Sequence, residues 1–229
     1  MKLFVGLLLL STSLVAQSSK QGTVIGTWEG NATVHGQQVP VKLEISGSAN
    51  DLHAALRNGP ESSPASSAVL TGNHLLISFN YYAKTIDATL ANGRLDGSFG
   101  TAAVRYPIIL SSAGAVSAYN GPLAKNIEGD WEIATNSAKG EAAWQLRVEP
   151  QPHSSDVKAV IQRVDGDTGS LYGQWTGQSY KVSHFSAAGP ALYSLTPQAD
   201  GTLLVSNMLR ADVNEQQGLV ARRPARTEM

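Results

Sequence analysis

Hydrophobic and polar residues alternate along much of the chain, and this alternation predicts β-strands. In the segment VPVKLEIS, the apolar residues Val39, Val41, Leu43 and Ile45 alternate with polar neighbours, and HLLISFNY and TIDATLANG behave similarly. A period of two places the apolar side chains on one face of a strand, and that face is then buried. No segment beyond the N-terminal region shows a sustained helical period. The pattern therefore predicts an all-β protein.

Pairs of turn residues separate the predicted strands. Each pair joins an Asn or Asp to a Gly, and the pairs lie at Asn58–Gly59, Asn92–Gly93, Asp165–Gly166 and Asp200–Gly201. These residues tolerate the positive φ angles that tight β-hairpins need. We therefore expect short strands that are connected in sequence by hairpins.

The same pattern occurs twice in the chain. GTWEG begins at Gly26 and GDWEI begins at Gly129, so a shift of 103 superimposes Trp28 on Trp131. Later strands align at shifts of 105 and 108, and the differences fall in predicted turns, where insertions cost little. The aligned positions are Val41, Leu43 and Ile45 with Trp144, Leu146 and Val148; Leu52, Ala54 and Leu56 with Val157, Ala159 and Ile161; and NGRL at Asn92 with DGTL at Asp200.

Each copy offers about eight strands, which suffice to close an antiparallel barrel and so remove exposed sheet edges. We predict two tandem up-and-down β-barrels of the lipocalin-like type. Trp28 and Trp131 are expected to plug one end of each barrel. The predicted boundaries are a signal peptide at 1–18, a first barrel at 22–112, a linker at 113–126, a second barrel at 127–224 and a tail at 225–229.

One hairpin pair in the second copy predicts a candidate ligand site. If Thr176 to Ser179 form one turn, Trp175 faces Tyr180. If Ala187 to Pro190 form the next turn, His184 faces Tyr193, and Val182 faces Leu195. Alternation then places these side chains on one face, which we expect to be the barrel interior. The predicted ligand-binding residues are Trp175, Tyr180, His184 and Tyr193.

The first copy has apolar residues at the positions that this alignment makes equivalent: Leu70, Leu75, Ile77, Phe79, Ala88 and Leu90. The second interior is therefore expected to be more polar than the first. Buried polar groups need hydrogen-bond partners. They either satisfy one another, with His184 bonded to Tyr193, or they bind a ligand.

The N-terminal residues have the layout of a secretory signal peptide. Lys2 precedes an apolar run from Leu3 to Leu10, and small polar residues follow. The run is too short to span a bilayer as a helix, which takes roughly 20 residues. We predict a periplasmic or secreted protein with no stable membrane anchor after cleavage.

Composition and charge narrow the function further. The formal net charge is −1, which argues against nucleic acid, because phosphates require a basic face. The chain has no cysteine, so thiol redox chemistry and thiolate metal ligation are excluded. No two of the five histidines have zinc-site spacing, and no G-x-S-x-G motif occurs. Asp165 and Asp167 lack the further ligands of a calcium loop, so a polar hairpin turn is expected there. We predict no cofactor and no metal.

The double pattern resembles the β-region that precedes the redox domain in exported bacterial TlpA-type proteins, which carry a C-terminal thioredoxin-like (AhpC/TSA redoxin) domain. The segments that carry the resemblance are GTWEG, VPVKLEI and LANGRLDGSF in the first copy, and GDWEI, RVDGDTGSLYGQW, VSHF and DGTL in the second. A redox domain with a C-x-x-C motif would follow in such proteins. This chain has none, so the redox activity of the family does not carry over.

The resemblance and the missing thiols lead to one functional expectation and two alternatives. We expect an exported, non-catalytic interaction or binding module of the cell envelope whose partner is a thioredoxin-like envelope protein. The first alternative is a carrier that holds a small apolar ligand in the second barrel. The second alternative is a hydrolase with an unrecognised site.

Overall fold

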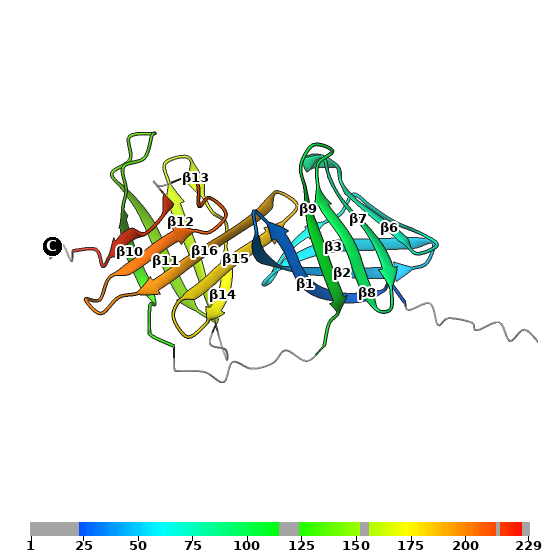
Figure 1. Cartoon of the computed structure of the whole chain (residues 1–229), viewed down its shortest axis with the longest axis horizontal. Helices are drawn as coiled ribbons and strands as arrows, with labels where there is room; N and C mark the ends of the chain where they lie inside the picture. Colours follow the sequence, from blue (N-terminus) through cyan, green and yellow to red (C-terminus); the bar gives the residue numbers. More distant parts are fainter. Residues whose placement is uncertain (1–22, 115–123, 152–155, 214–215, 226–229) are drawn as a thin grey trace, which may run out of the picture.

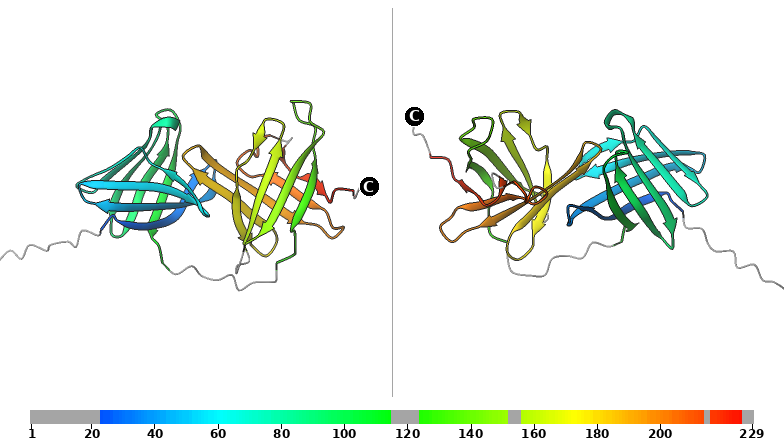
Figure 2. Two further views of the ribbon diagram at one scale, coloured as in Figure 1. Left: turned by 180° about the vertical axis from the view of Figure 1, so that it is seen from behind. Right: turned by 45° about the horizontal axis from the view of Figure 1, so that its top comes forward.

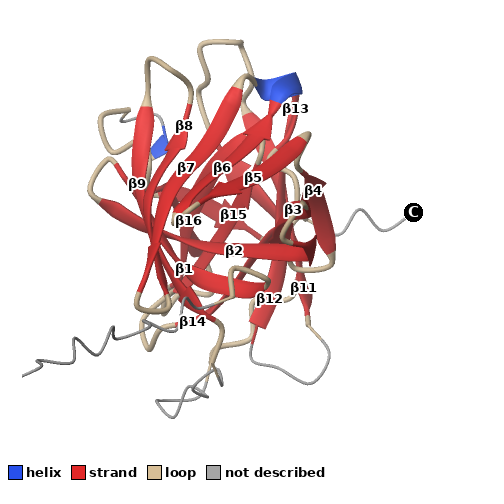
Figure 3. Cartoon of the chain, turned by 90° about the vertical axis from the view of Figure 1, so that its right-hand side faces the viewer, coloured by secondary structure: helices blue, strands red, loops and turns tan. Residues whose placement is uncertain are grey.

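Strands form where the sequence alternates, and the burial of their side chains follows the same period. A computed structural model describes residues 23–114, 124–151, 156–213 and 216–225. In β2 (Gln37–Ser48), the side chains of Val39, Val41, Leu43 and Ile45 are buried, whereas the polar residues between them lie outside. Strands make up nearly all of the regular structure of the described chain (Figure 3).

The first repeat is built from nine strands and one short 3₁₀ helix, η1 (Asn80–Tyr82). Its strands are β1 (Gly26–Val34), β2, β3 (Asp51–Asn58), β4 (Glu61–Pro64), β5 (Ser67–Thr71), β6 (His74–Phe79), β7 (Lys84–Ala91), β8 (Arg94–Gly100) and β9 (Arg105–Ser112).

The second repeat has nine strands in the same sequential arrangement. They are β10 (Gly129–Ala134), β11 (Ala143–Pro150), β12 (Asp156–Arg163), β13 (Gly166–Asp167), β14 (Leu171–Trp175), β15 (Tyr180–Ser186), β16 (Gly189–Pro197), β17 (Leu203–Asn207) and β18 (Leu219–Arg222).

Both sheets close on themselves. The strand order of the first is β2-β1-β9-β8-β7-β6-β5-β3-β4, and an additional β2–β3 pairing closes eight of the strands into an antiparallel barrel. The second has the order β11-β10-β18-β17-β16-β15-β14-β12-β13 and closes through β11–β12. The ninth strands, β4 and β13, extend only the hairpins of β3 and β12. The predicted pair of tandem antiparallel barrels is thus confirmed, and the two lie side by side (Figure 1).

The two G-x-W motifs occupy the same place in the two barrels. Trp28 in β1 pairs with Leu43, and Trp131 in β10 pairs with Leu146. Each indole is buried, and each donates its Nε1–H to the carbonyl four residues earlier, Trp28 to Val24 at 2.8 Å and Trp131 to Ile127 at 2.9 Å. The repeated sequence thus produces a repeated anchor that ties the strand entering each barrel to its core.

The strand pairing also shows where the second repeat gains residues over the first. Four residues separate the paired Phe79 and Lys84 at the end of the β6–β7 hairpin. Six residues separate the equivalent pair, His184 and Ala191, in the β15–β16 hairpin. The β15–β16 hairpin is therefore two residues longer, and it ends in a turn at Ala187 and Ala188.

That longer hairpin changes the relation between the barrels. The tip of β15–β16 projects from the second barrel towards the first (Figures 1 and 2). The buried core cluster of the first barrel includes Phe185, Ala187, Leu192 and Leu209 of the second repeat. A separate cluster fills the second barrel.

Part of the predicted organisation lies outside the described residues. The predicted signal peptide, most of the predicted linker and most of the predicted tail belong to this category. In the described part of the chain, no helix is long and apolar enough to cross a bilayer.

Candidate functional site: the junction and the mouth of the second barrel

The junction between the barrels is built on an apolar plug. Phe185 is only 2% exposed although its side chain lies on the outer face of the second barrel. It packs against Phe99 of β8, with 4.8 Å between the ring centroids. Ala187 and Leu192 are buried beside it. The first barrel thus uses the tip of a hairpin from the second barrel to complete its core.

Three hydrogen bonds cross the junction around this plug. Lys84 Nζ donates to the carbonyl of Ala188 in the hairpin turn. Asn58 Nδ2 donates to the Ser170 carbonyl at 2.8 Å. On another side, His35 Nδ1 donates to the Leu209 carbonyl at 2.9 Å.

These contacts come from three separate hairpins of the first barrel, so they restrain the barrels in more than one direction. The Asn58 contact is reinforced by the neighbouring Gly59. A Cβ atom at Gly59 would lie 2.7 Å from the ring of Tyr172, and a side chain there would push the barrels apart. Burial lowers the pKa of Lys84, as expected for an amine that lies at an interface.

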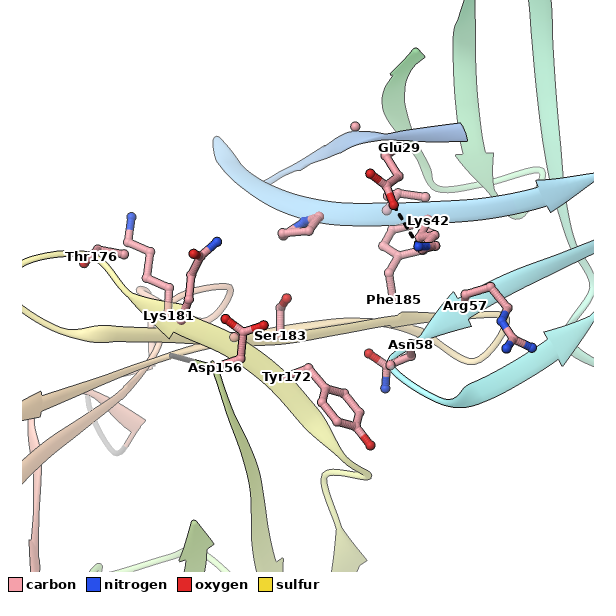
Figure 4. A pocket seen from close by; sticks show the side chains of 16 residues that line it. Glu29, Lys42, Arg57, Asn58, Asp156, Tyr172, Thr176, Lys181, Ser183 and Phe185 are labelled. Carbon is pink, nitrogen blue, oxygen red and sulfur yellow. Dashed lines mark ion pairs between the residues drawn. The ribbon is translucent and has the colours of Figure 1, made fainter. Parts of the chain in front are cut away.

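A cleft of about 490 Å³ opens between the barrels beside the plug, and we call it the junction cleft (Figure 4). The first barrel contributes residues of β1, β2, β3 and the β3–β4 turn, and the second contributes residues of β12, β14 and β15. Phe185 and Tyr172 supply apolar surface within the cleft. The charged residues that line it are Glu29, Lys42, Arg57, Asp156 and Lys181.

Some of these charges are neutralised within the protein, and one is not. Lys42 Nζ lies 2.8 Å from Glu29 Oε1, and Arg57 Nε lies 3.5 Å from Glu44 Oε2. Lys181, by contrast, is exposed, and its ammonium group makes no hydrogen bond or ion pair with the described residues. The junction cleft therefore combines apolar surface with a mixed set of charges and one free ammonium group.

Two of the predicted ligand residues, Trp175 and Tyr180, lie in the interior of the second barrel. They pair across β14 and β15 as predicted, with their ring centroids 5.2 Å apart. The hydroxyl of Tyr180 donates to the Lys125 carbonyl at 2.8 Å, and burial raises the pKa of this phenol. Within the described chain, the buried Trp175 Nε1–H has no hydrogen-bond partner.

The predicted pairing of β15 with β16 is wrong by two residues. His184 pairs with Ala191, and Val182 rather than His184 pairs with Tyr193. Tyr193 therefore corresponds to Ile86 of the first barrel and not to Ala88. A slip of two residues preserves the faces of a strand. For this reason Tyr193 is still buried in the second barrel, as predicted.

The corrected pairing also removes the predicted bond between His184 and Tyr193. The Tyr193 hydroxyl instead accepts hydrogen bonds from Arg163 Nη2 at 2.5 Å and from Asn207 Nδ2 at 3.3 Å. Burial raises the pKa of the Tyr193 phenol above its usual 10.0, while the positive charges of Arg163 and Arg210 act in the opposite direction. Tyr193 is therefore protonated at neutral pH.

His184 pairs with Ala191, forms no hydrogen bond with the Tyr193 hydroxyl in the described structure, and is only partly buried. Burial lowers the pKa of its imidazole, whereas hydrogen bonds to the backbone of Gly189 and Thr168 act in the opposite direction. These contacts hold His184 between its own hairpin turn and the loop that follows β13. Of the four predicted site residues, the structure pairs Trp175 with Tyr180 but does not pair His184 with Tyr193.

The other chemical candidates lie on the surface. Asp165 and Asp167 belong to the β12–β13 hairpin, which confirms the predicted polar turn. His74 Nε2 lies 2.8 Å from Asp87 Oδ1 on the exposed outer face of the first barrel. No group of three or more His, Asp or Glu side chains suited to a metal ion occurs among the residues that the structure describes.

Two residues of the candidate sites, Phe185 and Arg163, were not predicted from the sequence. The sequence carries a signal for Phe185, because it interrupts the alternation in which Tyr180 and Val182 point inwards. An apolar side chain out of phase with its strand indicates a second buried face. Arg163 carries no comparable signal, because its position at the end of β12 is typical of a solvated residue.

Fold and site together define a tandem eight-stranded β-barrel protein with a cleft at the barrel junction. No family model matches the sequence, and no curated protein matches it. Among solved structures, the chain matches a protein of unknown function from the DUF3598 family of Nostoc punctiforme. The match has 11% identity and covers 86% of this chain and 93% of the other, with a TM-score of 0.28.

Proposed function

We propose that this chain is an exported, non-catalytic binding module that docks a partner protein in the junction cleft. The observation that carries the proposal is the construction of the cleft from both barrels around a buried plug. Clefts between packed domains are frequent binding sites. Because Phe185 and the three crossing hydrogen bonds already hold the barrels together, the walls of the cleft need little ordering when a partner binds.

The chemistry of the junction cleft supports a polypeptide partner. Apolar surface from Phe185 and Tyr172 lies among charged groups, and this is the composition of a protein interface with an apolar centre and a polar rim. The unpaired Lys181 adds a cation that an acidic side chain of the partner would neutralise. Under the resemblance to TlpA-type proteins, the partner would be a thioredoxin-like envelope protein, and redox chemistry would reside in that partner.

A photo-cross-linking experiment tests this proposal. A benzophenone amino acid replaces Gln174, which is exposed in the junction cleft, and in a control it replaces His74 on the outer face of the first barrel. Each protein is irradiated with a purified thioredoxin-like envelope protein from the same organism. We expect an adduct from position 174 only, and Lys181→Glu should reduce its yield. An equal yield from both positions, or no adduct at either, would contradict docking in the cleft.

A carrier of a small apolar ligand in the second barrel is the second candidate. The buried Trp175 Nε1–H favours it, because an unpaired buried donor is uncommon in a native core. The interior side chains nevertheless pack into one cluster around Trp175 and Tyr180. A discrete extra mass in native mass spectrometry, lost in Trp175→Phe, would favour the carrier over the docking module.

A further inference from the structure

A second cleft, of about 370 Å³, lies at the open end of the second barrel, and we call it the barrel mouth. The second barrel contributes Arg163 from β12, Tyr193 from β16 and Asn207 from β17, together with Arg210 from the loop that follows β17. The turn between β1 and β2 of the first barrel covers one side, with His35 in the lining. The barrel mouth is therefore a pocket that forms only where the two barrels meet.

The hydrogen bonds of Tyr193 show that this pocket lacks an acceptor. Its hydroxyl oxygen accepts from Arg163 Nη2 and from Asn207 Nδ2. The orientation of the Asn207 amide is fixed, because its Oδ1 accepts from the backbone N–H of Leu209 at 3.1 Å and its Nδ2 donates to Gln216 Oε1 at 2.8 Å. With both lone pairs engaged, the hydroxyl can only donate its proton. Among the described residues, nothing accepts that proton.

Arg163 adds further unused donors to the same place. Its guanidinium lies over the ring of Trp144, 4.6 Å from the centroid, and this stacking holds the group in position. Its Nε–H is buried and has no hydrogen-bond partner in the described part of the chain. A buried, unpaired donor on a charged group is costly, so its persistence indicates a missing acceptor.

The other charged side chains of the barrel mouth do not supply the missing acceptor. Arg210 is exposed and makes only a long contact, 3.9 Å, with Asp212. Asp167 also lines the pocket, and its Oδ1 accepts the backbone N–H of Gly169 at 2.7 Å. Asp167 and Arg163 form no ion pair in the described structure, and Asp165, whose pKa the Arg163 charge helps to lower, pairs with Lys139. Donors therefore outnumber acceptors around the Tyr193 hydroxyl.

We infer that the barrel mouth is a binding site for a small oxyanion, a carboxylate or phosphate group on a compact molecule. Such a group would accept hydrogen bonds from the Tyr193 hydroxyl and the Arg163 guanidinium, and Arg210 would add a second positive charge. Arginine presents several donors in a rigid plane that suits both anions. The packed core beneath Tyr193 excludes a long apolar tail from the barrel interior. This site is separate from the junction cleft and does not depend on a protein partner.

Isothermal titration calorimetry at low ionic strength tests the inference with two probes, succinate and inorganic phosphate. We expect at least one of them to bind with one-to-one stoichiometry, and the preferred probe identifies the anion. Tyr193→Phe retains the ring and removes the hydroxyl, so it should weaken binding roughly tenfold, the effect of losing one hydrogen bond to a charged group. Arg163→Gln should abolish measurable binding. The control, Arg147→Gln, alters an exposed arginine of the same barrel that pairs with Asp130 and should leave binding unchanged.

A loss of binding must be distinguished from a loss of folding. Circular dichroism establishes whether Arg163→Gln retains the barrel, and if it does not, Tyr193→Phe and the exposed Arg210→Gln decide the outcome. The inference is overturned if neither anion binds the unmodified protein. It is equally overturned if Tyr193→Phe and Arg210→Gln bind as tightly as the control. Neither result bears on the cross-links from position 174, so the two proposals fail separately.

Discussion

The β6–β7 hairpin of the first barrel and the β15–β16 hairpin of the second occupy equivalent places in a duplicated fold, yet their tips lie in opposite environments. The β6–β7 hairpin ends in η1, where Tyr81 is 91% exposed. The β15–β16 hairpin is two residues longer, and its Phe185 is 2% exposed inside the partner barrel. The hairpin that is longer by two residues thus forms the plug that joins the two barrels, whereas Tyr81 at the tip of the shorter hairpin stays exposed.

The duplication accounts for the two barrels but not for the candidate binding sites. Each barrel has its own strands, its own tryptophan anchor and its own closure. The junction cleft and the barrel mouth exist only because the tip of one copy enters the other. Function in this protein is therefore expected to depend on features that differ between the repeats.

The largest effect on stability should come from truncating the buried side chain at the tip of the β15–β16 hairpin. Phe185→Ala should destabilise the protein by about 3 kcal/mol, because it leaves a cavity in the core of the first barrel. Tyr81→Ala, at the equivalent exposed tip, should change the free energy of unfolding by less than about 0.5 kcal/mol. Urea unfolding measures both. Similar values for the two variants would show that the buried plug contributes little.

The tryptophan anchor occurs in both barrels, so its loss should destabilise the two barrels equally. Trp28→Phe and Trp131→Phe each remove the indole donor that bonds to a carbonyl four residues earlier. Each should cost about 1–3 kcal/mol, since a buried carbonyl loses its partner. Differential scanning calorimetry of the two variants checks this. A marked inequality between them would mean that the motif has taken different roles in the two copies.

The smallest effect should be a pH dependence of stability caused by His184 of the second barrel, because the first barrel has Phe79 at the equivalent position. Burial lowers the pKa of His184 below 6.5, so the folded state binds this proton less readily than the unfolded state does. The stability contribution is therefore present above pH 6.5 and is lost as the pH falls through the lower pKa of the folded state. His184→Phe introduces the residue of the first copy, Phe79, and should flatten this part of the stability profile.

Chemical denaturation at a series of pH values between neutral and mildly acidic conditions measures that profile. His74→Phe, at an exposed histidine of the first barrel, is the matched control and should leave the His184 contribution in place. An unchanged slope in His184→Phe would show that other groups cause the acid sensitivity.

Local patterns determined the fold to a considerable extent. The alternation in VPVKLEIS, the Asn–Gly and Asp–Gly turns and the repeated G-x-W motif predicted two closed barrels. They also predicted the pairing of Trp175 with Tyr180. These features depend on neighbours within a few residues or on the burial of one strand face. Each of these two causes produces a recognisable pattern in the sequence.

Only the tertiary structure decided the register of β15–β16 and the sites that depend on it. Gly189 and Pro190 have the composition of a turn, yet both belong to β16, and Pro190 pairs with Phe185. The hairpin continues beyond them because Phe185 and Ala187 are buried in the other barrel, a contact between residues far apart in the chain. Of the two hydrogen-bond partners of Tyr193, Asn207 lies opposite it on the neighbouring strand β17, whereas Arg163 comes from β12, which does not adjoin β16. Long-range burial of this kind outweighs local turn preference. The out-of-phase Phe185 indicates a second buried face, but no pattern of near neighbours encodes which surface covers it.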